Sequence, residues 1–471
     1  MKLKKFTEFS KTILPNEAKY LEKRIRFVDA EKCDIIKLLI SNALPNNNFK
    51  AFNVDLDKRK YTYIKSWVLK QLRAIDVDVS INWILSLKNK ILTDIISPKE
   101  ESDFLMFLSD YDKELDFNFQ SIFELAKDYK PYLLVRMRYK DHKTVSIFLE
   151  TYESFYVKSK KIHRKLYQAT IEITNQYTLN KSNPKYWEKW LNKIFNTKEI
   201  DGRNRYNAFV LLAFLFTNNN QTSKLENIFN LIDDYFNNGE LYSRRLLSNY
   251  YASRVLLHSK QNEFNKAEYY ALLSIRQHNN DTLMYTNNLV AILLKNRNFS
   301  KAQKILDDSL MLFKSSPNNH QRVGYISYKI RVLTELGHYK LAEETIDFYL
   351  KTNAKEILKY RWHHFFTSAF NLLIKIEKYG KLLKICNRYS ILEEELLQKS
   401  KPNYIPNILW SIFLSKYMEE NINETQLLDE LEKSMILLNP NNNDKKILLK
   451  VLNQFSNNLP NVFHKFKSHF I

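Results

Sequence analysis

Glycine, proline and cysteine are scarce in this chain. Five glycines and ten prolines punctuate 471 residues, too few for an all-β sandwich with many tight turns, so helices are favoured. The two cysteines, Cys33 and Cys386, are far apart and sit among apolar residues in helical patterns. We therefore expect buried thiols rather than a disulfide framework.

Long apolar runs are also absent. The richest run, 208–216, covers about two helical turns, which is too short to span a membrane. The N-terminal sequence MKLKKFTEFSKTIL is basic, but neither an apolar run nor a small-residue cleavage site follows it. With 44% hydrophobic residues, the chain is too apolar to be disordered. We expect a folded cytoplasmic protein without a membrane span.

Acidic residues are outnumbered by basic ones. The chain has 73 Lys and Arg against 52 Asp and Glu, which gives a formal net charge of +21. A positive field of this size favours an acidic partner. Much of the surplus is lysine, mixed with abundant asparagine and isoleucine, and AT-rich codon usage produces the same mixture. The sequence leaves open whether the charge serves binding or reflects codon bias.

Motifs for catalysis and cofactor binding are missing. The sequence has no G-x-x-x-x-G-K or G-x-G-x-x-G loop to cradle a phosphate, and no G-x-S-x-G elbow. His363 and His364 are adjacent, so on a helix they point about 100° apart and cannot easily share a metal ion. We predict a protein that is not an enzyme, with no catalytic residue, no metal site and no cofactor.

Two acidic pairs flank one predicted helix, Asp55 with Asp57 and Asp76 with Asp78. Paired carboxylates can bind Mg²⁺ or share acid–base work. They also cap helix N-termini, where their charge favours the positive end of the helix dipole. Capping is the favoured interpretation.

A recurring pair of residues is the most informative pattern in the chain. Four aromatic residues, at 264, 299, 339 and 379, each lie three positions before a small or apolar residue, and each pair separates two helix-like stretches. The small or apolar positions are 267, 302, 342 and 382, so the spacings are 35, 40 and 40 residues. Such a period predicts stacked helical hairpins.

The residues at these turns resemble the tetratricopeptide-repeat family. In that family, a turn with glycine is followed by an aromatic residue and then, three residues on, by alanine. The stretch 336–342, LGHYKLA, matches this pattern, and 298–302 and 263–267 match it without the glycine. The resemblance covers roughly residues 205–400, and the periods here exceed the usual length. It implies a right-handed α-solenoid that binds peptides or partner proteins in a concave groove.

The sequence thus predicts an all-α protein in three parts. We expect a helical N-terminal domain over residues 1–180, helical hairpin repeats over 181–400, and divergent capping helices over 401–471. Ser97 and Glu100 have the spacing of a capping box in the first part.

Basic residues gather in two places that suit binding to phosphate or to an acidic peptide. The predicted partner-binding set is Arg203, Arg205, Arg244, Arg245 and Arg254. A secondary basic face comprises Arg136, Arg138, Lys158, Lys161 and Lys165. Two alternatives remain open: the lysines form an ordinary solvated face, or some of the arginines pair internally with acids such as Asp201, Asp233 or Asp234.

These observations predict a non-enzymatic scaffold that binds an acidic protein segment or a partner subunit through a basic surface of its hairpins. Nucleic-acid binding by the same surface is the alternative. A regulatory or enzymatic N-terminal domain attached to a repeat sensor has no motif to support it.

Overall fold

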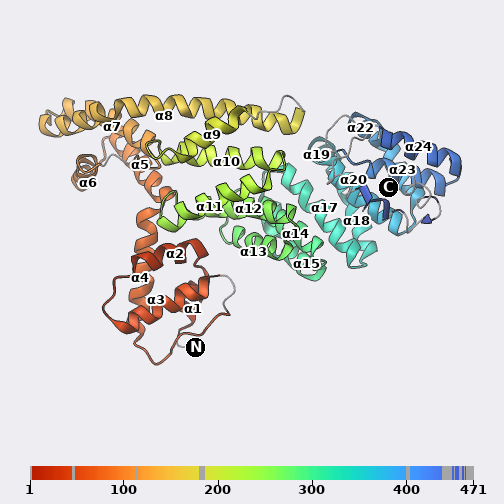
Figure 1. Ribbon diagram of the computed structural model, residues 1–471, viewed down its shortest axis with the longest axis horizontal. Coiled ribbons are helices and arrows are strands. Elements are labelled where there is room, and N and C mark those ends of the chain that lie inside the picture. Colours follow the sequence, from red (N-terminus) through yellow and green to blue (C-terminus); the bar gives the residue numbers. More distant parts are fainter. Residues whose placement is uncertain are drawn as a thin grey trace. The chain divides into compact units, whose positions relative to one another are not determined.

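The computed structural model describes residues 3–44, 48–111, 115–179, 186–398 and 404–436, with a few positions between 448 and 462. Within this described part of the chain, every regular element is a helix (Figure 1). None of these described helices has the length and apolar character needed to cross a membrane. The predicted all-α class is confirmed.

The chain divides into two compact units, Met1–Gln277 and His278–Ile471, which we call unit 1 and unit 2. The domain boundaries predicted from the sequence, after residues 180 and 400, lie outside the described residues. That three-part division stays a prediction.

Unit 1 has two apolar cores. One core is built on α5 to α7 and the N-terminal half of α8, and the other joins the remaining helices of the unit. The helices are α1 (Lys4–Lys11), α2 (Pro15–Arg24), α3 (Ala30–Ala43), α4 (Lys58–Ile75), α5 (Val77–Leu92), α6 (Pro98–Ser109), α7 (Phe119–Val135), α8 (Tyr139–Leu179), α9 (Tyr186–Asn196), α10 (Gly202–Asn218), α11 (Thr222–Asn238), α12 (Arg244–Lys260) and α13 (Phe264–Ser274).

Helix starts in unit 1 follow the capping signals in the sequence. The Ser97 hydroxyl accepts the Glu100 N–H, and the Glu100 carboxylate accepts the Ser97 N–H, which confirms the capping box. Asp57 and Asp76 cap α4 and α5 through their side-chain oxygens. Asp78 lies in the first turn of α5, where its charge suits the helix dipole.

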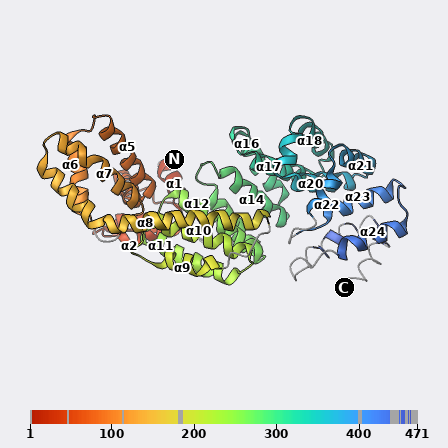
Figure 2. The ribbon, with the colours of Figure 1, turned by 90° about the horizontal axis from the view of Figure 1, so that it is seen from above.

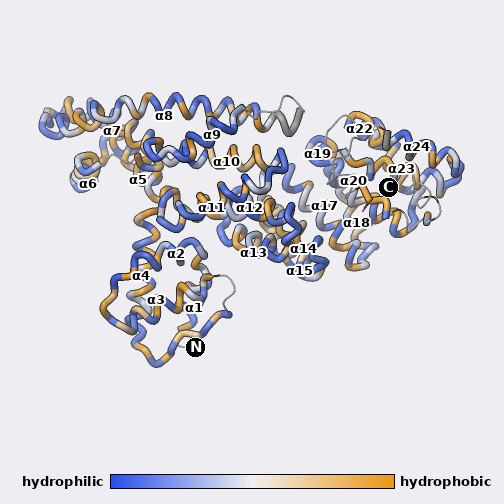
Figure 3. The backbone as a smooth tube through the Cα atoms, in the orientation of Figure 1, coloured by the Kyte–Doolittle hydropathy of each residue, from blue (hydrophilic) through white to orange (hydrophobic). Residues whose placement is uncertain are grey.

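From α8 onward, unit 1 is a stack of helical hairpins. Helix α10 packs against both α8 and α9, and α12 packs against α10, α11 and α13. Figures 1 and 2 show α8 running beside α10 from two directions. The hydropathy colours of Figure 3 alternate along these helices, as expected when one face is buried and the other is solvated.

Unit 2 continues with hairpins in which each first helix packs directly on the next. Helices α14, α17, α20 and α23 follow one another in this way, while α15, α18 and α21 each pack on the following first helix. The helices are α14 (Thr282–Lys295), α15 (Phe299–Asp308), α16 (Leu310–Ser315), α17 (Asn319–Glu335), α18 (Tyr339–Thr352), α19 (Ala354–Tyr360), α20 (Trp362–Lys375), α21 (Tyr379–Arg388), α22 (Ile391–Gln398), α23 (Asn407–Met418) and α24 (Glu424–Ile436).

One turn geometry closes the hairpins of both units. In each such turn, a single residue adopts a left-handed conformation, and the N–H of the next residue bonds to a carbonyl five residues back, as in a Schellman motif. The left-handed residues are Asn220, Asn262, Arg297, Gly337, Glu377 and Glu420. Met137, between α7 and α8, has the same conformation and bond. The repeated turn therefore begins earlier in the chain than the sequence pattern indicates.

The small residues of the sequence pattern lie where helices meet. Ala267, Ala302 and Ala342 have no exposed surface, and Leu382 is equally buried. Each lies in the first turn of the second helix of its hairpin. Their burial supports the role expected for them, which is to let two helices approach closely.

Candidate partner-binding surface

The first helices of the hairpins carry almost no acid. From α10 onward these helices are α10, α12, α14, α17, α20 and α23, and Glu335, the last residue of α17, is their one carboxylate. Each of the six contains at least one Lys or Arg. Second helices such as α11 and α18 carry several carboxylates each. Carboxylates are therefore sorted by helix position in most hairpins, although the second helix α21 also has none.

Two of the five predicted binding arginines are buried in unit 1. The Arg254 guanidinium donates to Asp233 at 2.6 Å and to the Tyr250 hydroxyl at 2.8 Å. Arg205 donates from Nε to the Phe195 carbonyl at 3.2 Å and lies over the ring of Tyr235 at 4.6 Å. These contacts support the internal alternative for both residues, including the predicted pairing with Asp233.

Two further arginines of the set join α12 to other helices. Arg244 pairs with Glu17 of α2 through Nε at 2.8 Å and Nη2 at 3.1 Å. Arg245 makes a bidentate pair with Asp78, at 2.7 and 3.1 Å. Arg203 is exposed. A partner-binding role for the set stays a prediction, although four of its members already have partners within unit 1.

The secondary basic residues lie at two separate places. At the α7–α8 turn, Arg136 pairs with Asp94 at 2.7 Å, and Arg138 pairs with Glu101 at 2.6 Å. Lys158 lies 20 residues along α8 from Arg138, about 30 Å at 1.5 Å per residue. The structure therefore does not bring the arginines and the lysines together.

The lysines of the secondary face form a solvated stripe on α8. Lys158 and Lys161 are exposed and make no ion pair with another described residue. Lys165 lies over the ring of Trp190, with 4.6 Å between Nζ and the ring centroid. No acid occurs between Glu153 and Glu172.

A cluster of polar residues in unit 2 was not predicted from the sequence. At Gly324 in α17, a side-chain Cβ would lie 2.5 Å from Arg361 Nη1 and 3.2 Å from Asn287 Nδ2. The missing side chain therefore leaves room for the guanidinium and the amide beside the backbone of α17. The rings of Tyr328 and His364 pack edge to face beside them, with 4.7 Å between centroids. We call these five residues the Gly324 cluster.

The Gly324 cluster has a positive environment. Burial lowers the pKa of His364 to about 3, and the neighbouring charges that lower it further are Arg361, Arg331, His363 and His320. Burial raises the pKa of Tyr328, and Arg361 and Arg331 oppose that rise. Neither arginine makes an ion pair with another described residue. The neighbouring groups that lower the pKa of His364 are therefore all basic side chains.

Two buried atoms of the Gly324 cluster have unused hydrogen-bonding capacity. Asn287 is 2% exposed, and its Nδ2 donates to the Gln321 carbonyl at 2.9 Å, but its Oδ1 has no partner. His364 Nδ1 is likewise buried without a partner. Buried polar atoms in native structures are nearly always paired, so both atoms indicate a place where a ligand can bond.

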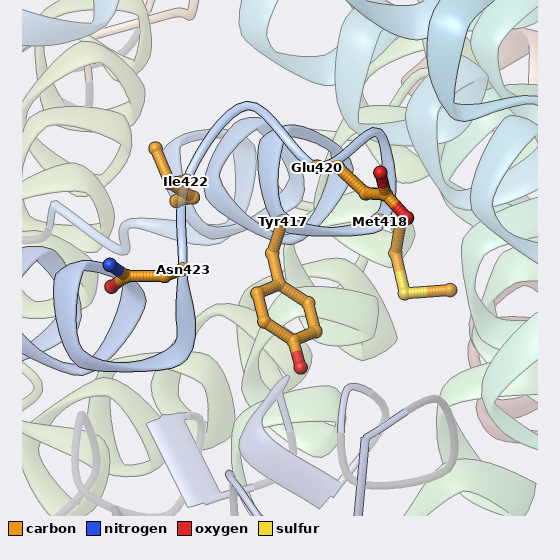
Figure 4. A pocket seen from close by; sticks show the side chains of 5 residues that line it. All are labelled: Tyr417, Met418, Glu420, Ile422 and Asn423. Carbon is orange, nitrogen blue, oxygen red and sulfur yellow. The ribbon is translucent and has the colours of Figure 1, made fainter.

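Other candidate sites are weaker. The hollow in Figure 4 is open and shallow and is lined by Tyr417, Met418, Glu420, Ile422 and Asn423 at the α23–α24 turn, with no cluster of charge. Within the described ranges, no three His, Cys, Asp or Glu side chains are grouped closely enough to hold a metal ion. Both cysteines are free; Cys386 is buried as expected, whereas Cys33 is only partly covered.

The sequence contained two signals for the Gly324 cluster. A glycine inside a helix costs about 1 kcal/mol relative to alanine and usually has a packing or functional reason. Gly324 is such a residue, and it is one of only five glycines. The second signal is the absence of acids from the helices on either side of it.

Comparison with known proteins adds little. No model of a known protein family matches the chain, and no curated protein matches it. The crystal structure of the APC/C hetero-tetramer Cut9–Hcn1 is similar with a TM-score of 0.40 and 12% sequence identity, over 89% of this chain and 81% of that one. A likeness of that size supports no conclusion about family or partner. The fold assignment rests on the helices and turns described above.

Proposed function

We propose that this protein is a non-enzymatic cytoplasmic scaffold that binds an acidic segment of a protein partner on the first helices of its hairpins. The observation that carries the proposal is the near absence of carboxylates from those six helices. Codon bias raises lysine throughout a chain, but it does not remove acids from one helix of each hairpin. A sorted charge pattern is what recognition of an acidic ligand requires.

Unit 2 supports the proposal more directly than unit 1. The arginines of α10 and α12 are largely engaged with acids and carbonyls of unit 1. In unit 2, Arg331 and Arg361 have no acidic partner among the described residues. Their guanidinium groups can pair bidentately with a carboxylate.

Titration with a fluorescent peptide tests the proposal. The probe is a short peptide of alternating glutamate and alanine, and its twin carries glutamine in place of each glutamate. We expect the full chain to bind the glutamate peptide and to bind the twin at least about tenfold more weakly, since charge-assisted hydrogen bonds are lost. Equal affinity for the two peptides, or no binding of either, would contradict the proposal.

Nucleic-acid binding is the second candidate, and a group of exposed cations on α8 is the observation that favours it. Lys158, Lys161 and Arg164 are exposed, and Tyr167 beside them is 66% exposed. Cations with a neighbouring aromatic ring suit phosphate contacts and base stacking. If this candidate is correct, replacing the three cations by glutamine should weaken binding of single-stranded RNA at least about tenfold, and should leave peptide binding unchanged.

A further inference from the structure

The Gly324 cluster contains a set of groups that complement a peptide carboxylate. Arg361, the residue before α20, supplies a guanidinium donor at Gly324. Arg331 of α17 adds a second positive charge that acts on the cluster. Arg361 is partly exposed and Arg331 is exposed, so a ligand can reach both from solvent. No acid of α14 or α20 competes for Arg361, whereas Glu335 lies four residues, about one turn, beyond Arg331 on α17.

The cluster also contains a buried acceptor without a partner. Asn287 Oδ1 is buried and unpartnered, and it needs an N–H or O–H donor. A peptide brings backbone N–H groups together with its carboxylates, whereas a free carboxylate ion brings only acceptors. An arginine without an ion pair, beside an amide oxygen without a partner, therefore favours a peptide.

We propose that the Gly324 cluster is the site in unit 2 that binds an acidic residue of a peptide, with Arg361 on the carboxylate and Asn287 Oδ1 on a backbone N–H. This proposal rests on the proposed function and assigns it to named residues. Arg361 is the principal contact, because its guanidinium lies directly over Gly324. Gly324 acts by keeping that place open.

Two variants test the site, and a third is a matched control. Arg361→Gln removes the charge and keeps most of the side chain. Gly324→Ala adds a Cβ where Arg361 Nη1 now lies, and because the obstructed atom is the end of a flexible side chain, the helix can keep its fold while the guanidinium is displaced. Arg388→Gln removes an exposed arginine from the second helix α21 and changes the net charge equally.

The measurement is the anisotropy titration with the glutamate peptide, on full-length chains whose circular dichroism and urea midpoint match the wild type. We expect Arg361→Gln to weaken binding at least about tenfold, which corresponds to the loss of one charge-assisted contact. Gly324→Ala should weaken binding in the same direction, Arg361→Lys should restore part of the affinity, and Arg388→Gln should bind as the wild type does.

The possible failures are distinguishable. If the wild type prefers the glutamate peptide over its glutamine twin but Arg361→Gln and Gly324→Ala retain full affinity, the site is wrong and the proposed function stands. If the wild type shows no preference, both are wrong. If Arg361→Gln loses affinity for single-stranded RNA but not for the peptide, the ligand assigned to the cluster is wrong.

Discussion

Arg254 shows how a residue chosen for binding can serve the fold. Its guanidinium is almost fully buried between the rings of Phe229 and Tyr250 and is paired with Asp233. Removing one member of a buried pair leaves the other desolvated without compensation, which is more costly than losing the contact itself. The burial of Arg254 therefore outweighs its chemical suitability for a ligand.

We expect Arg254→Ala to lower the free energy of unfolding of unit 1 by about 3 kcal/mol, because Asp233 is left without its cation. Urea unfolding followed by circular dichroism measures the change. Arg203→Ala is the control, since Arg203 is exposed, and it should change stability by less than about 0.5 kcal/mol. Equal stability of the two variants would show that the Arg254 pair contributes nothing.

Ala302 tests the packing of the hairpins. It is fully buried in the first turn of α15, and α15 packs against both α14 and α17. Ala302→Phe should overpack this contact and destabilise the protein by about 1–3 kcal/mol. Ser300 lies two residues before Ala302 and is exposed, so Ser300→Phe adds the same ring without overpacking and is the control. An unchanged urea midpoint for Ala302→Phe would refute the assignment of the helix crossing.

His364 should make the stability of unit 2 sensitive to acid. Its folded-state pKa is about 3, against 6.5 for a free histidine, first because it is buried and then because of Arg361 and Arg331. Between these two pH values the unfolded chain binds a proton that the folded chain does not. Stability is therefore full above about pH 6.5 and falls as the pH drops toward 3, by up to about 1.4 kcal/mol per pH unit.

The variant His364→Gln should flatten this slope, because it removes the titrating group. Urea midpoints measured from pH 7 to pH 4 provide the test. His338→Gln, in the exposed α17–α18 turn, is a matched control and should retain the wild-type slope. Identical slopes for His364→Gln and the wild type would mean that His364 is not held neutral by its surroundings.

At the scale of the helix, the sequence predicted a hairpin most clearly where a residue suited to the turn is followed by a small residue suited to the helix crossing. Around Gly337 both signals are present, since glycine readily adopts the left-handed conformation and Ala342 is buried at the crossing. At Arg297 and Glu377 the same turn is made without glycine, and the aromatic residue that follows, with the small or apolar residue three positions further on, marked it.

The α7–α8 turn was missed for a related reason. Met137 adopts the left-handed conformation and Tyr139 follows two residues later, but no small residue at the usual spacing completes the pattern. The pairs of Arg244 with Glu17 and of Arg245 with Asp78 were missed because each joins residues more than 160 positions apart. Local periodicity carries no information about such contacts.

The docking of α2 onto α11 and α12 is one of these distant contacts. Glu17 is fully buried and accepts hydrogen bonds from the Tyr242 hydroxyl at 2.6 Å and from Arg244. Beside it, Asn16 donates to Asp233 at 2.9 Å and accepts from Tyr251 at 2.7 Å. This buried polar junction fixes α2 against the hairpins of unit 1.

We expect Arg244→Glu to release α2 by placing a second carboxylate against Glu17, with a loss of about 3 kcal/mol or more in stability. Hydrogen exchange of the α2 amides measures the release. Arg245→Glu is the comparison, because Arg245 is 54% exposed in its pair with Asp78 and should cost about 1 kcal/mol or less. Full protection of α2 in Arg244→Glu would contradict the role assigned to Glu17.

At the scale of the molecule, net charge and charge placement make different predictions. A net charge of +21 attracts any polyanion, and this attraction weakens steeply with salt. A built site with an arginine and an amide retains short contacts that ions screen much less. The dependence of affinity on salt therefore separates general attraction from recognition.

We expect the glutamate peptide to lose affinity only modestly between about 50 and 200 mM salt, because a few short contacts at the Gly324 cluster hold it. Single-stranded RNA should bind at low salt and weaken by orders of magnitude over the same range, since several counterions are released for each bound strand. The Arg361→Gln variant should then retain the steep RNA curve while its peptide curve falls at every salt concentration. If the peptide curve of the wild type is as steep as the RNA curve, the charge acts only as a diffuse field, and the sorting of acids away from the first helices has no role in recognition.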